Sequence, residues 1–412
     1  MLRPGELDLS IAANFDDGFP YAYFKMLRAE APVCWHPERD GPGHWALTRY
    51  EDLKYASRNP QIFSSWLGAT TVRDMPHENL QGARALMLNM DPPQHAKYRR
   101  LVQRGFTPRV IQSLEPHIRE LATQIVDRVA QRGECEFVSE VAAELPMQVI
   151  CELMGVPEED RQAVYALSNR LIGVDDPQYS NSLADGMQAS MEMFMYASKL
   201  SERARQAPGT DIISTLVSAD VEGEKLSELD FNSFFLLLAV AGNETTRTAT
   251  SQGTRLLADH PEQRERLLRN PSLLPTAIEE IVRCSAPVMY FRRTATQDTE
   301  LRGQTIRAGE KITMWYPSVN RDEAVFPNPD TFDVGRSPNE HLGYGVGEHF
   351  CLGASLARLE LQIIFEELLR RLPDIQIDGP IKRLRSNLID GIKEMPVRFT
   401  PEGRGATVAV PA

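Results

Sequence analysis

The sequence lacks any apolar stretch long enough to span a bilayer. A membrane-spanning helix needs about 20 predominantly apolar residues, whereas the longest apolar run is Phe234–Ala241. The first residues carry several acids and lack the basic-then-apolar order of a secretory signal. We therefore expect a cytoplasmic protein without a membrane anchor.

Cysteines are few, and basic residues are outnumbered by acidic ones. The five cysteines are widely spaced with no CxxC pair, which indicates reduced thiols rather than a disulfide framework. The net charge of -12 argues against nucleic-acid binding, because such a partner presents a row of phosphates. No internal repeat or low-complexity linker divides the chain. We expect a single domain over residues 1–412, with peripheral tails at 1–15 and 403–412.

Helical periodicity is the main pattern that is present. It runs over Pro116–Arg132, Leu226–His260 and Leu352–Arg371. The second of these begins with Ser227 as an N-cap and Asp230 three residues on, a capping-box pattern.

Strand signals are few, at His44–Thr48, Ile312–Tyr316 and Pro396–Thr400, and the stretch Phe326–Asn339 is predicted to be ordered coil. We predict a mainly α fold with a small β-rich lobe.

One cysteine stands in a distinctive loop, HLGYGVGEHFCLG, over residues 341–353. Three glycines precede Cys351, and an amphipathic helix follows it. Glycine permits positive φ and close approach to a flat ligand. A helix start is expected to lower the pKa of the thiol. A thiolate suits an iron(III) ligand and favours O–O cleavage. The alternative is a buried structural cysteine after a flexible turn.

This loop resembles the F-x-x-G-x-x-x-C-x-G segment of the cytochrome P-450 superfamily in its soluble bacterial form. Gly347, Cys351 and Gly353 match, while Tyr344 replaces the usual Phe. The resemblance extends from about Asp16 to Thr400. It implies the cytochrome P-450 fold, haem b (iron protoporphyrin IX) as cofactor, and Cys351 as the axial iron ligand.

The long helical stretch contains Ala241-Gly242-Asn243-Glu244-Thr245-Thr246. Glycine and threonine weaken a helix interior, and a Thr hydroxyl can bond back to the carbonyl four residues earlier. A widened turn is therefore predicted here. The segment is similar to the family's A/G-G-x-E/D-T pattern, which implies that Glu244 is the acid and Thr245 the hydroxyl of a proton relay. Ala241 and Gly242 would border the haem.

Two further sets of residues follow from the resemblance. The propionates of haem need cationic or donor partners, and the family pattern assigns these roles to His95, Arg99, Arg293 and His349, with Arg292 as a competitor for Arg293. The family's E-x-x-R pair matches Glu280 and Arg283, which Arg336 would join. This trio is expected to be structural, holding the coil that presents Cys351.

The substrate side is predicted from family geometry and composition. It would draw on residues 64–88, 165–195, 234–241 and 288–291, which are apolar and rich in methionine. Residues 288–295 and 384–393 resemble bacterial hydroxylases of steroid side chains, branched fatty acids, alkanes and terpenoids. A hydrophobic sterol, terpenoid or fatty-acid substrate is expected.

The implied activity is a haem-thiolate monooxygenase that uses dioxygen. The chain has no G-x-G-x-x-G segment for a flavin or nicotinamide, so a ferredoxin and an NAD(P)H-dependent ferredoxin reductase would supply electrons. Basic residues at 97, 100, 104, 109 and 358 are candidates for the ferredoxin-docking face. The alternatives are a hydrogen-peroxide-driven peroxygenase and a non-catalytic haem sensor.

Overall fold

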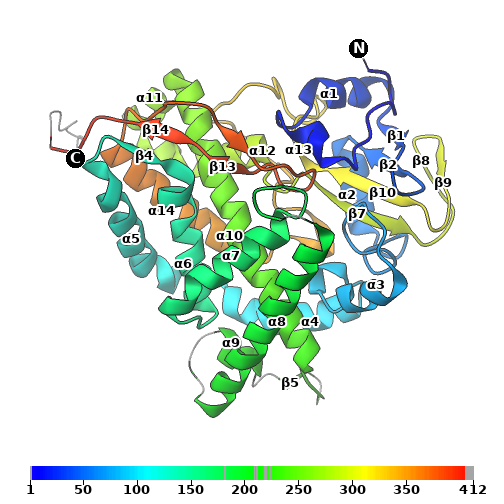
Figure 1. Ribbon diagram of the computed structural model, residues 1–412. Helices are drawn as coiled ribbons and strands as arrows, with labels where there is room; N and C mark the ends of the chain where they lie inside the picture. The colour runs from blue at the N-terminus through cyan, green and yellow to red at the C-terminus, as the bar shows by residue number, and fades with distance from the viewer. Residues whose placement is uncertain are drawn as a thin grey trace.

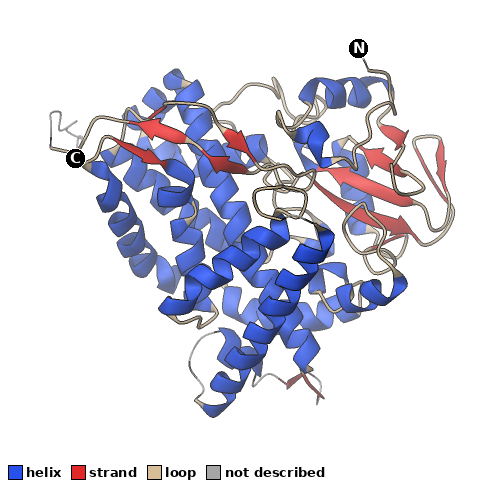
Figure 2. Cartoon of the chain, viewed as in Figure 1, coloured by secondary structure: helices blue, strands red, loops and turns tan. Residues whose placement is uncertain are grey.

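Helices build most of the molecule, many strands gather in a smaller lobe at one side, and a second group of strands lies across the helices on the other side (Figures 1 and 2). A computed structural model describes residues 2–180, 182–207, 209, 212–217, 220–221 and 224–403. The side chain of Arg104, one of the basic residues considered for ferredoxin docking, lies outside this description.

A long central helix, α10 (Glu228–Asp259), organises the helical part. Its start confirms the predicted capping box, because Ser227 accepts from the N–H of Asp230 and the Asp230 side chain accepts from the N–H of Ser227. The helices that pack around it include α6 (Glu144–Leu153), α7 (Arg161–Ile172), α8 (Leu183–Gln206), α12 (Leu274–Ser285) and α14 (Ala354–Arg371). α10 is α-helical throughout, so the predicted widened turn at Gly242 is not seen.

Helix α5 (Pro108–Ala130) packs against α14 and begins eight residues before the predicted start at Pro116. Thr107 caps it by accepting from the N–H of Val110, and Pro108 fits the first turn, where no donor is needed. Pro116 is tolerated within the helix on its exposed side. The remaining helices are α1 (Tyr21–Glu30), α2 (Tyr50–Arg58), α3 (His77–Ala83), α4 (Gln94–Val102), α9 (Ile212–Val217), α11 (Pro261–Arg269) and α13 (Tyr316–Val319).

The β-rich lobe is a five-stranded sheet whose order is β1 (Val33–His36), β2 (His44–Leu47), β10 (Lys311–Trp315), β7 (Tyr290–Ala295) and β3 (Phe63–Ser64). β10 is parallel to β2 and antiparallel to β7, pairing Ile312 with Arg293. A second sheet joins β11 (Gln376–Ile377), β14 (Pro396–Arg398) and β4 (Glu134–Glu136). Three two-stranded pairs complete the set: β12–β13 (Lys382–Arg383, Ile392–Glu394), β8–β9 (Thr299–Leu301, Gln304–Ile306) and β5–β6 (Asp220–Val221, Glu224–Lys225). The three predicted strands are thus present.

The N-terminal segment is not the peripheral tail that was predicted. Leu9, Ala12 and Phe15 are buried, and the Phe15 ring stacks on Trp315 of β10 with centroids 5.7 Å apart. Leu9 and Phe15 supply part of a core cluster shared with α1 and the sheet. Of the predicted C-terminal tail, residues 404–412 lie outside the described part of the chain. Within that part, no helix is both long enough and apolar enough to cross a membrane.

Candidate functional site

An internal cavity lies between α10 and the loop that carries Cys351. Its walls come from α2, α4, α6, α10, α12, α13, α14, the 287–293 segment and the 343–353 loop. All eight residues expected to border the haem line it: His95, Arg99, Ala241, Gly242, Arg293, His349, Cys351 and Gly353. Thr245 lines it as well, whereas Glu244 does not.

The loop that holds Cys351 is closed by its own backbone. The N–H of Cys351 donates to the carbonyl of Tyr344 at 2.8 Å, and the N–H of Gly345 donates to Leu342 at 2.9 Å. Gly345 and Gly347 have φ of +71° and +78°. A Cβ at Gly347 would stand 2.7 Å from the carbonyl oxygen of Ser57, so both conformation and close packing require glycine here.

The pKa of Cys351 differs from the prediction. Burial raises the pKa of this thiol, and the N–H of Gly353 together with Arg99 and Arg358 offsets only part of the rise. α14 begins at Ala354, three residues after the cysteine, so the helix terminus acts at a distance. A bound metal cation would add to these groups in stabilising a thiolate.

Four donor groups meet at the cavity without carboxylate partners among the described residues. Arg99 donates to the carbonyls of Glu348 and Phe350 at 3.2 and 2.6 Å, and buried Arg293 donates to the carbonyl of Arg292 at 2.7 Å. The rings of His95 and His349 lie 4.1 Å apart, and Nδ1 of His95 is buried without a partner. Burial lowers the pKa of His95 to about 4.

Arg292 is excluded from this cluster. Its guanidinium donates to Asp74 at 2.7 Å and to backbone carbonyls of residues 71 and 72. Neighbouring residues of a strand point to opposite faces, so β7 presents Arg293 to the cavity and Arg292 to the 71–74 segment. Of the two arginines, Arg293 lines the cavity and Arg292 does not.

The structure brings Glu280, Arg283 and Arg336 together. Glu280 accepts from Arg283 at 2.7 and 2.8 Å and from Nε of Arg336 at 3.0 Å, with the side chains of Glu280 and Arg283 fully buried. Arg283 also donates to the carbonyls of Asn320, Pro329 and Thr331, and Arg336 to those of residues 327, 328 and 331. The trio thus binds α12 to the coil before the Cys351 loop.

Replacing Glu280 with alanine is expected to destabilise the fold by about 3–5 kcal/mol, the usual cost of leaving one partner of a buried ion pair alone. Denaturant unfolding monitored by circular dichroism measures this change. The matched control is Glu265→Ala, because Glu265 is an exposed i,i+4 partner of Arg269. Loss of that surface pair should cost under about 1 kcal/mol. Equal effects of the two changes would contradict a supporting role.

The predicted relay residues face different surroundings. The hydroxyl of Thr245 donates to the carbonyl of Ala241 at 2.8 Å, as the i−4 pattern predicted. The Glu244 carboxylate is buried and pairs with Arg247, which also donates to Tyr165 and Asn169 of α7 at 2.9 Å each. Glu244 is thus held away from the cavity by Arg247.

The glycine beside the relay has a packing role. A Cβ at Gly242 would meet the side chain of Ile150 on α6 at 2.8 Å. The close contact between α6 and α10 therefore explains this glycine without a widened turn.

Two polar residues on the Cys351 side of the cavity, Glu360 and Tyr344, were not predicted to be buried without hydrogen-bond partners. Glu360 of α14 is buried without a hydrogen-bond partner for Oε2, and burial raises its pKa to about 8. The Tyr344 hydroxyl is also buried and unpartnered, and burial raises its pKa. The sequence signal for Glu360 is that it is the only acid within the mostly apolar helical stretch Leu359–Phe365.

Arg358 proves to be a poor candidate for an open docking cation. It donates to Glu279 at 2.7 and 2.9 Å, and its guanidinium lies 4.3 Å from the centre of the Tyr344 ring. Burial opposes ionisation of Glu279, but hydrogen bonds from Arg358 and His341 lower its pKa to about 2. The charge of Arg358 is therefore already compensated.

Comparison with known proteins gives the family. The family model for cytochrome P450 matches residues 58–373, more than half of the chain. The chain is a cytochrome P450. It is 42% identical to a steroid C26-monooxygenase of Rhodococcus jostii over 98% of this chain and 87% of that protein. It is 44% identical to a methyl-branched lipid omega-hydroxylase of Mycobacterium bovis over 93% of this chain and 92% of that protein.

A solved structure agrees. The Mycobacterium marinum cytochrome P450 in complex with pseudoionone superposes with a TM-score of 0.90 at 42% identity, over 97% of this chain and 100% of that one. This P450 is therefore an oxidoreductase of the monooxygenase class with a haem cofactor, and the non-catalytic sensor hypothesis is set aside.

The cavity of this P450 fits a haem by its own chemistry. A flat, largely apolar group with an anionic edge needs apolar walls, one thiolate ligand and donors that lack acidic partners. Leucine, valine and phenylalanine side chains supply the walls, Cys351 the thiol, and His95, Arg99, Arg293 and His349 the donors. A Cβ added at Gly353 would meet nothing within 4 Å, as expected beside open space.

Proposed function

We propose that this P450 hydroxylates a sterol, terpenoid or branched fatty acid, using dioxygen and electrons from a ferredoxin and its reductase. Cys351 would ligate the iron of haem b, and His95, Arg99, Arg293 and His349 would hold its propionates. When bound, the haem supplies the oxygen chemistry, while the protein positions the substrate and protons. Glu244 and Thr245 would form the proton relay.

An apolar part of the cavity wall is the observation that carries the proposal. It consists of Met87, Leu88, Phe234, Leu237, Leu238, Val288 and Phe291, and its polar groups are the hydroxyls of Thr245 and Thr246. Three of the four predicted substrate regions contribute to it, whereas residues 165–195 do not. A substrate without polar groups near the reacting carbon gains most from such a wall, because binding follows the apolar area removed from water.

The names of the similar proteins point to the carbon of the substrate that is hydroxylated. Both C26 of a steroid and the omega carbon of a methyl-branched lipid are at the end of a branched alkyl chain. We infer that this P450 also hydroxylates a terminal methyl group. The abundance of methionine in the predicted substrate regions does not support this proposal. Met187, Met191 and Met195 are exposed, and of the methionines in those regions only Met87 lines the cavity.

Titration of the haem-loaded protein with steroids, terpenoids and branched fatty acids should shift the Soret band at micromolar ligand. Leu237→Gln is expected to raise the apparent Kd about tenfold or more, because an amide buried without a partner costs about 1–3 kcal/mol. Leu237→Met, which keeps an apolar side chain of similar size, serves as the control.

Mass spectrometry of the products, with ferredoxin and reductase or with hydrogen peroxide alone, then separates the monooxygenase from the peroxygenase alternative. Equal product yield from peroxide alone would contradict the need for a ferredoxin. Absence of any Soret shift across the three lipid classes would contradict the substrate class.

A further inference from the structure

A row of four basic side chains crosses the five-stranded sheet, one from each of four neighbouring strands. Its members, called the basic row below, are all buried: His36 of β1, His44 of β2, Lys311 of β10 and Arg292 of β7. The backbones of His36 and His44 lie directly opposite each other. Lys311 precedes Ile312, which pairs with the residue after His44. Because paired positions share a face and neighbours along a strand alternate, the row lies on the face opposite Arg293, away from the cavity.

The hydrogen bonds around His36 fit only its neutral form. Nδ1 of His36 donates to the carbonyl of Cys34 at 3.1 Å, which leaves Nε2 of the neutral ring as an acceptor. The Tyr23 hydroxyl lies 3.0 Å from this Nε2 and accepts from the N–H of Gly5 at 3.1 Å, so it donates its own proton to the ring. A second ring proton would face this donor and would leave the hydroxyl proton without its acceptor.

His44 is buried with even less support for a charge. Its ring stacks on that of His36 with centroids 5.9 Å apart, and both of its nitrogens lack a hydrogen-bond partner among the described residues. Burial holds the pKa of His44 well below its usual range, and nearby His36, Lys311 and Arg292 depress it further. Burial also lowers the pKa of His36 to about 4. Both rings are therefore neutral at pH 7.

The acids near the basic row are already paired with its two permanent cations. Lys311 pairs with Glu38 and, at 3.0 Å, with Asp74, while Arg292 pairs with Asp74 at 2.7 Å. Burial opposes ionisation of Asp74, but Arg292 and Lys311 keep its pKa below the usual range. Two positive charges are thus balanced by two negative ones, and a protonated histidine would add an uncompensated charge. The other polar or titratable groups that face the rings are Tyr23 of α1, Cys34 of β1 and Asp8 of the N-terminal segment.

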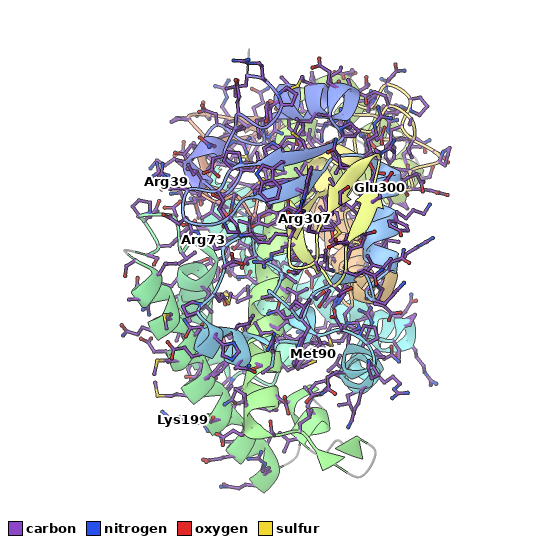
Figure 3. The ribbon with its side chains drawn as sticks, turned by 90° about the vertical axis from the view of Figure 1, so that its right-hand side faces the viewer. Arg39, Arg73, Met90, Lys199, Glu300 and Arg307 are labelled. Atoms are coloured by element: carbon purple, nitrogen blue, oxygen red, sulfur yellow. The ribbon has the colours of Figure 1, made fainter. Side chains whose placement is uncertain are left out.

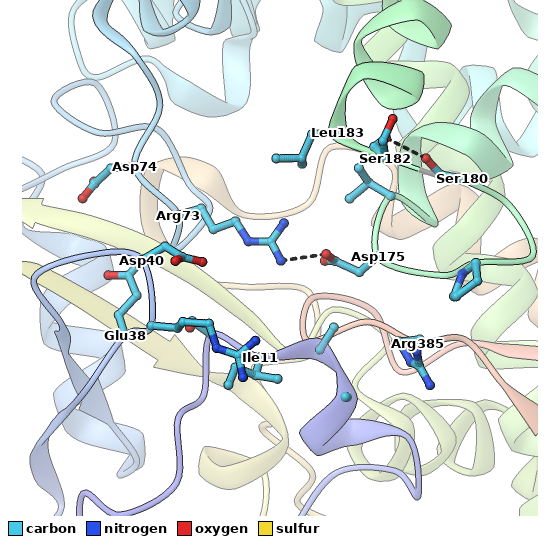
Figure 4. Close-up of a pocket in the computed structure, with 16 residues that line it drawn as sticks. Ile11, Glu38, Asp40, Arg73, Asp74, Asp175, Ser180, Ser182, Leu183 and Arg385 are labelled. Atoms are coloured by element: carbon cyan, nitrogen blue, oxygen red, sulfur yellow. Dashed lines mark hydrogen bonds and ion pairs between the residues drawn. The ribbon is translucent and has the colours of Figure 1, made fainter.

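The same ion pairs hold two surface segments on the sheet. Lys311 donates to the carbonyl of Val72 at 3.1 Å, and Arg292 donates to the carbonyls of residues 71 and 72. The 70–74 segment and the β1–β2 turn both line a surface pocket of about 790 Å³, with Glu38 and Asp74 in its wall (Figure 4). Arg39 of the turn and Arg73 line it too, and both lie at one edge of the molecule in Figure 3. The basic row thus connects the sheet to this pocket.

We propose that the basic row is an acid-responsive switch. Its two histidines take up protons in mildly acidic solution, and the β1–β2 hairpin and the 70–74 segment then separate from the sheet and open the pocket that they line. The physical reason is repulsion, because four buried positive charges would face two carboxylates. Separation lets water solvate the new charges, which buried neutral surroundings do not.

The direction of the pH dependence follows from the two states of the hairpin. In an opened hairpin the histidines meet water, where the pKa of histidine is about 6.5. The closed form binds fewer protons, since the pKa of His36 is about 4 and that of His44 is also lowered. The closed form is therefore fully stable above about pH 6.5 and loses stability as the pH falls toward 4. For two histidines, the ratio of opened to closed molecules should rise on the order of several hundredfold between pH 7 and pH 5.

The test is hydrogen exchange with mass spectrometry on the full-length, haem-loaded protein at pH 7 and pH 5, corrected for the intrinsic exchange rate at each pH. Protection of the amides in residues 33–47 and 70–74 should fall by about two orders of magnitude or more at pH 5. Protection of α10 and α14 should remain, and return to pH 7 should restore the hairpin.

His44→Phe is the variant that separates this switch from other effects of acid. Phenylalanine keeps a ring against His36 and removes two unpartnered nitrogens, so the hairpin should form normally at pH 7. With one proton fewer to bind, its loss of protection at pH 5 should be about thirtyfold smaller than that of the wild type. The matched control is His77→Phe, because His77 is an exposed histidine of α3, and this variant should behave like the wild type at both pH values.

Three results would overturn the proposal. Protection of residues 33–47 that is the same at pH 5 as at pH 7 would show that the hairpin stays closed. Equal losses in the hairpin, α10 and α14 would show general acid unfolding instead of a local switch. A loss in His44→Phe as large as that of the wild type would show that the histidine pair is not the group that binds the protons.

Discussion

Replacement of Cys351 by alanine is expected to abolish the strongly red-shifted Soret band of the reduced carbon monoxide complex, together with all hydroxylation. Cys351 is the thiol that lines the cavity, on a loop closed around it by the Tyr344 carbonyl and by glycines at positive φ. Alanine offers no thiolate to the iron, so the spectroscopic signature of that ligand should disappear. The difference spectrum of the reduced, carbon monoxide-treated protein measures the loss.

The other cysteines provide matched controls for this change. Cys135 and Cys151 are buried, burial raises the pKa of each to about 12, and neither lines the cavity. Cys135→Ala and Cys151→Ala should keep the band, at the cost of a small loss of stability from the cavity created. Persistence of the band in Cys351→Ala would refute thiolate ligation by this residue.

Local patterns of the sequence predicted the elements that local chemistry determines. Ser227 and Asp230 predicted the start of α10 because a capping box is complete within four residues. Thr245 predicted its own back-bond to Ala241 for the same reason. The start of α5 was missed because Pro116 was taken as its first residue, whereas Thr107 and Pro108 supply a better cap and Pro116 faces solvent.

The apolar face of α8 could not be assigned from periodicity alone. Methionines at 187, 191 and 195 occur at the spacing of a core face, and the sequence read that way predicts a substrate wall. The structure turns Gly186, Ala189 and Met193 inward and leaves Met187, Met191 and Met195 exposed. Which face is buried depends on the neighbouring helices, which spacing within one helix does not specify.

The pKa values and ion-pair partners of charged groups were the other property that could not be predicted from the sequence. A helix start predicted a lowered pKa for Cys351, but burial raises it more than the Gly353 N–H and two arginines lower it. Arg358 was counted as an outward charge, yet Glu279, 79 residues earlier in the chain, pairs with it. Such values depend on partners and burial that only the folded chain brings together.

Glu244→Gln is expected to slow turnover by about 10²–10⁴-fold, the usual contribution of a proton-transfer group. Substrate binding, measured by the Soret shift, should be unchanged because Glu244 does not line the cavity. Since the carboxylate is held by Arg247, which Tyr165 and Asn169 anchor to α7, proton delivery requires it to turn toward Thr245. Substrate-saturated turnover rates of the two proteins measure the effect.

Thr245 provides the second half of this prediction. Its hydroxyl proton is engaged by the Ala241 carbonyl, so its oxygen is left to accept a hydrogen bond from the cavity side. Thr245→Ala should therefore keep consuming NAD(P)H while electrons appear as hydrogen peroxide instead of product. Thr245→Ser, which retains the hydroxyl, should remain coupled. If Thr245→Ala gives as much product per NAD(P)H as the wild type, and Glu244→Gln keeps the wild-type rate, protons reach the haem by another route.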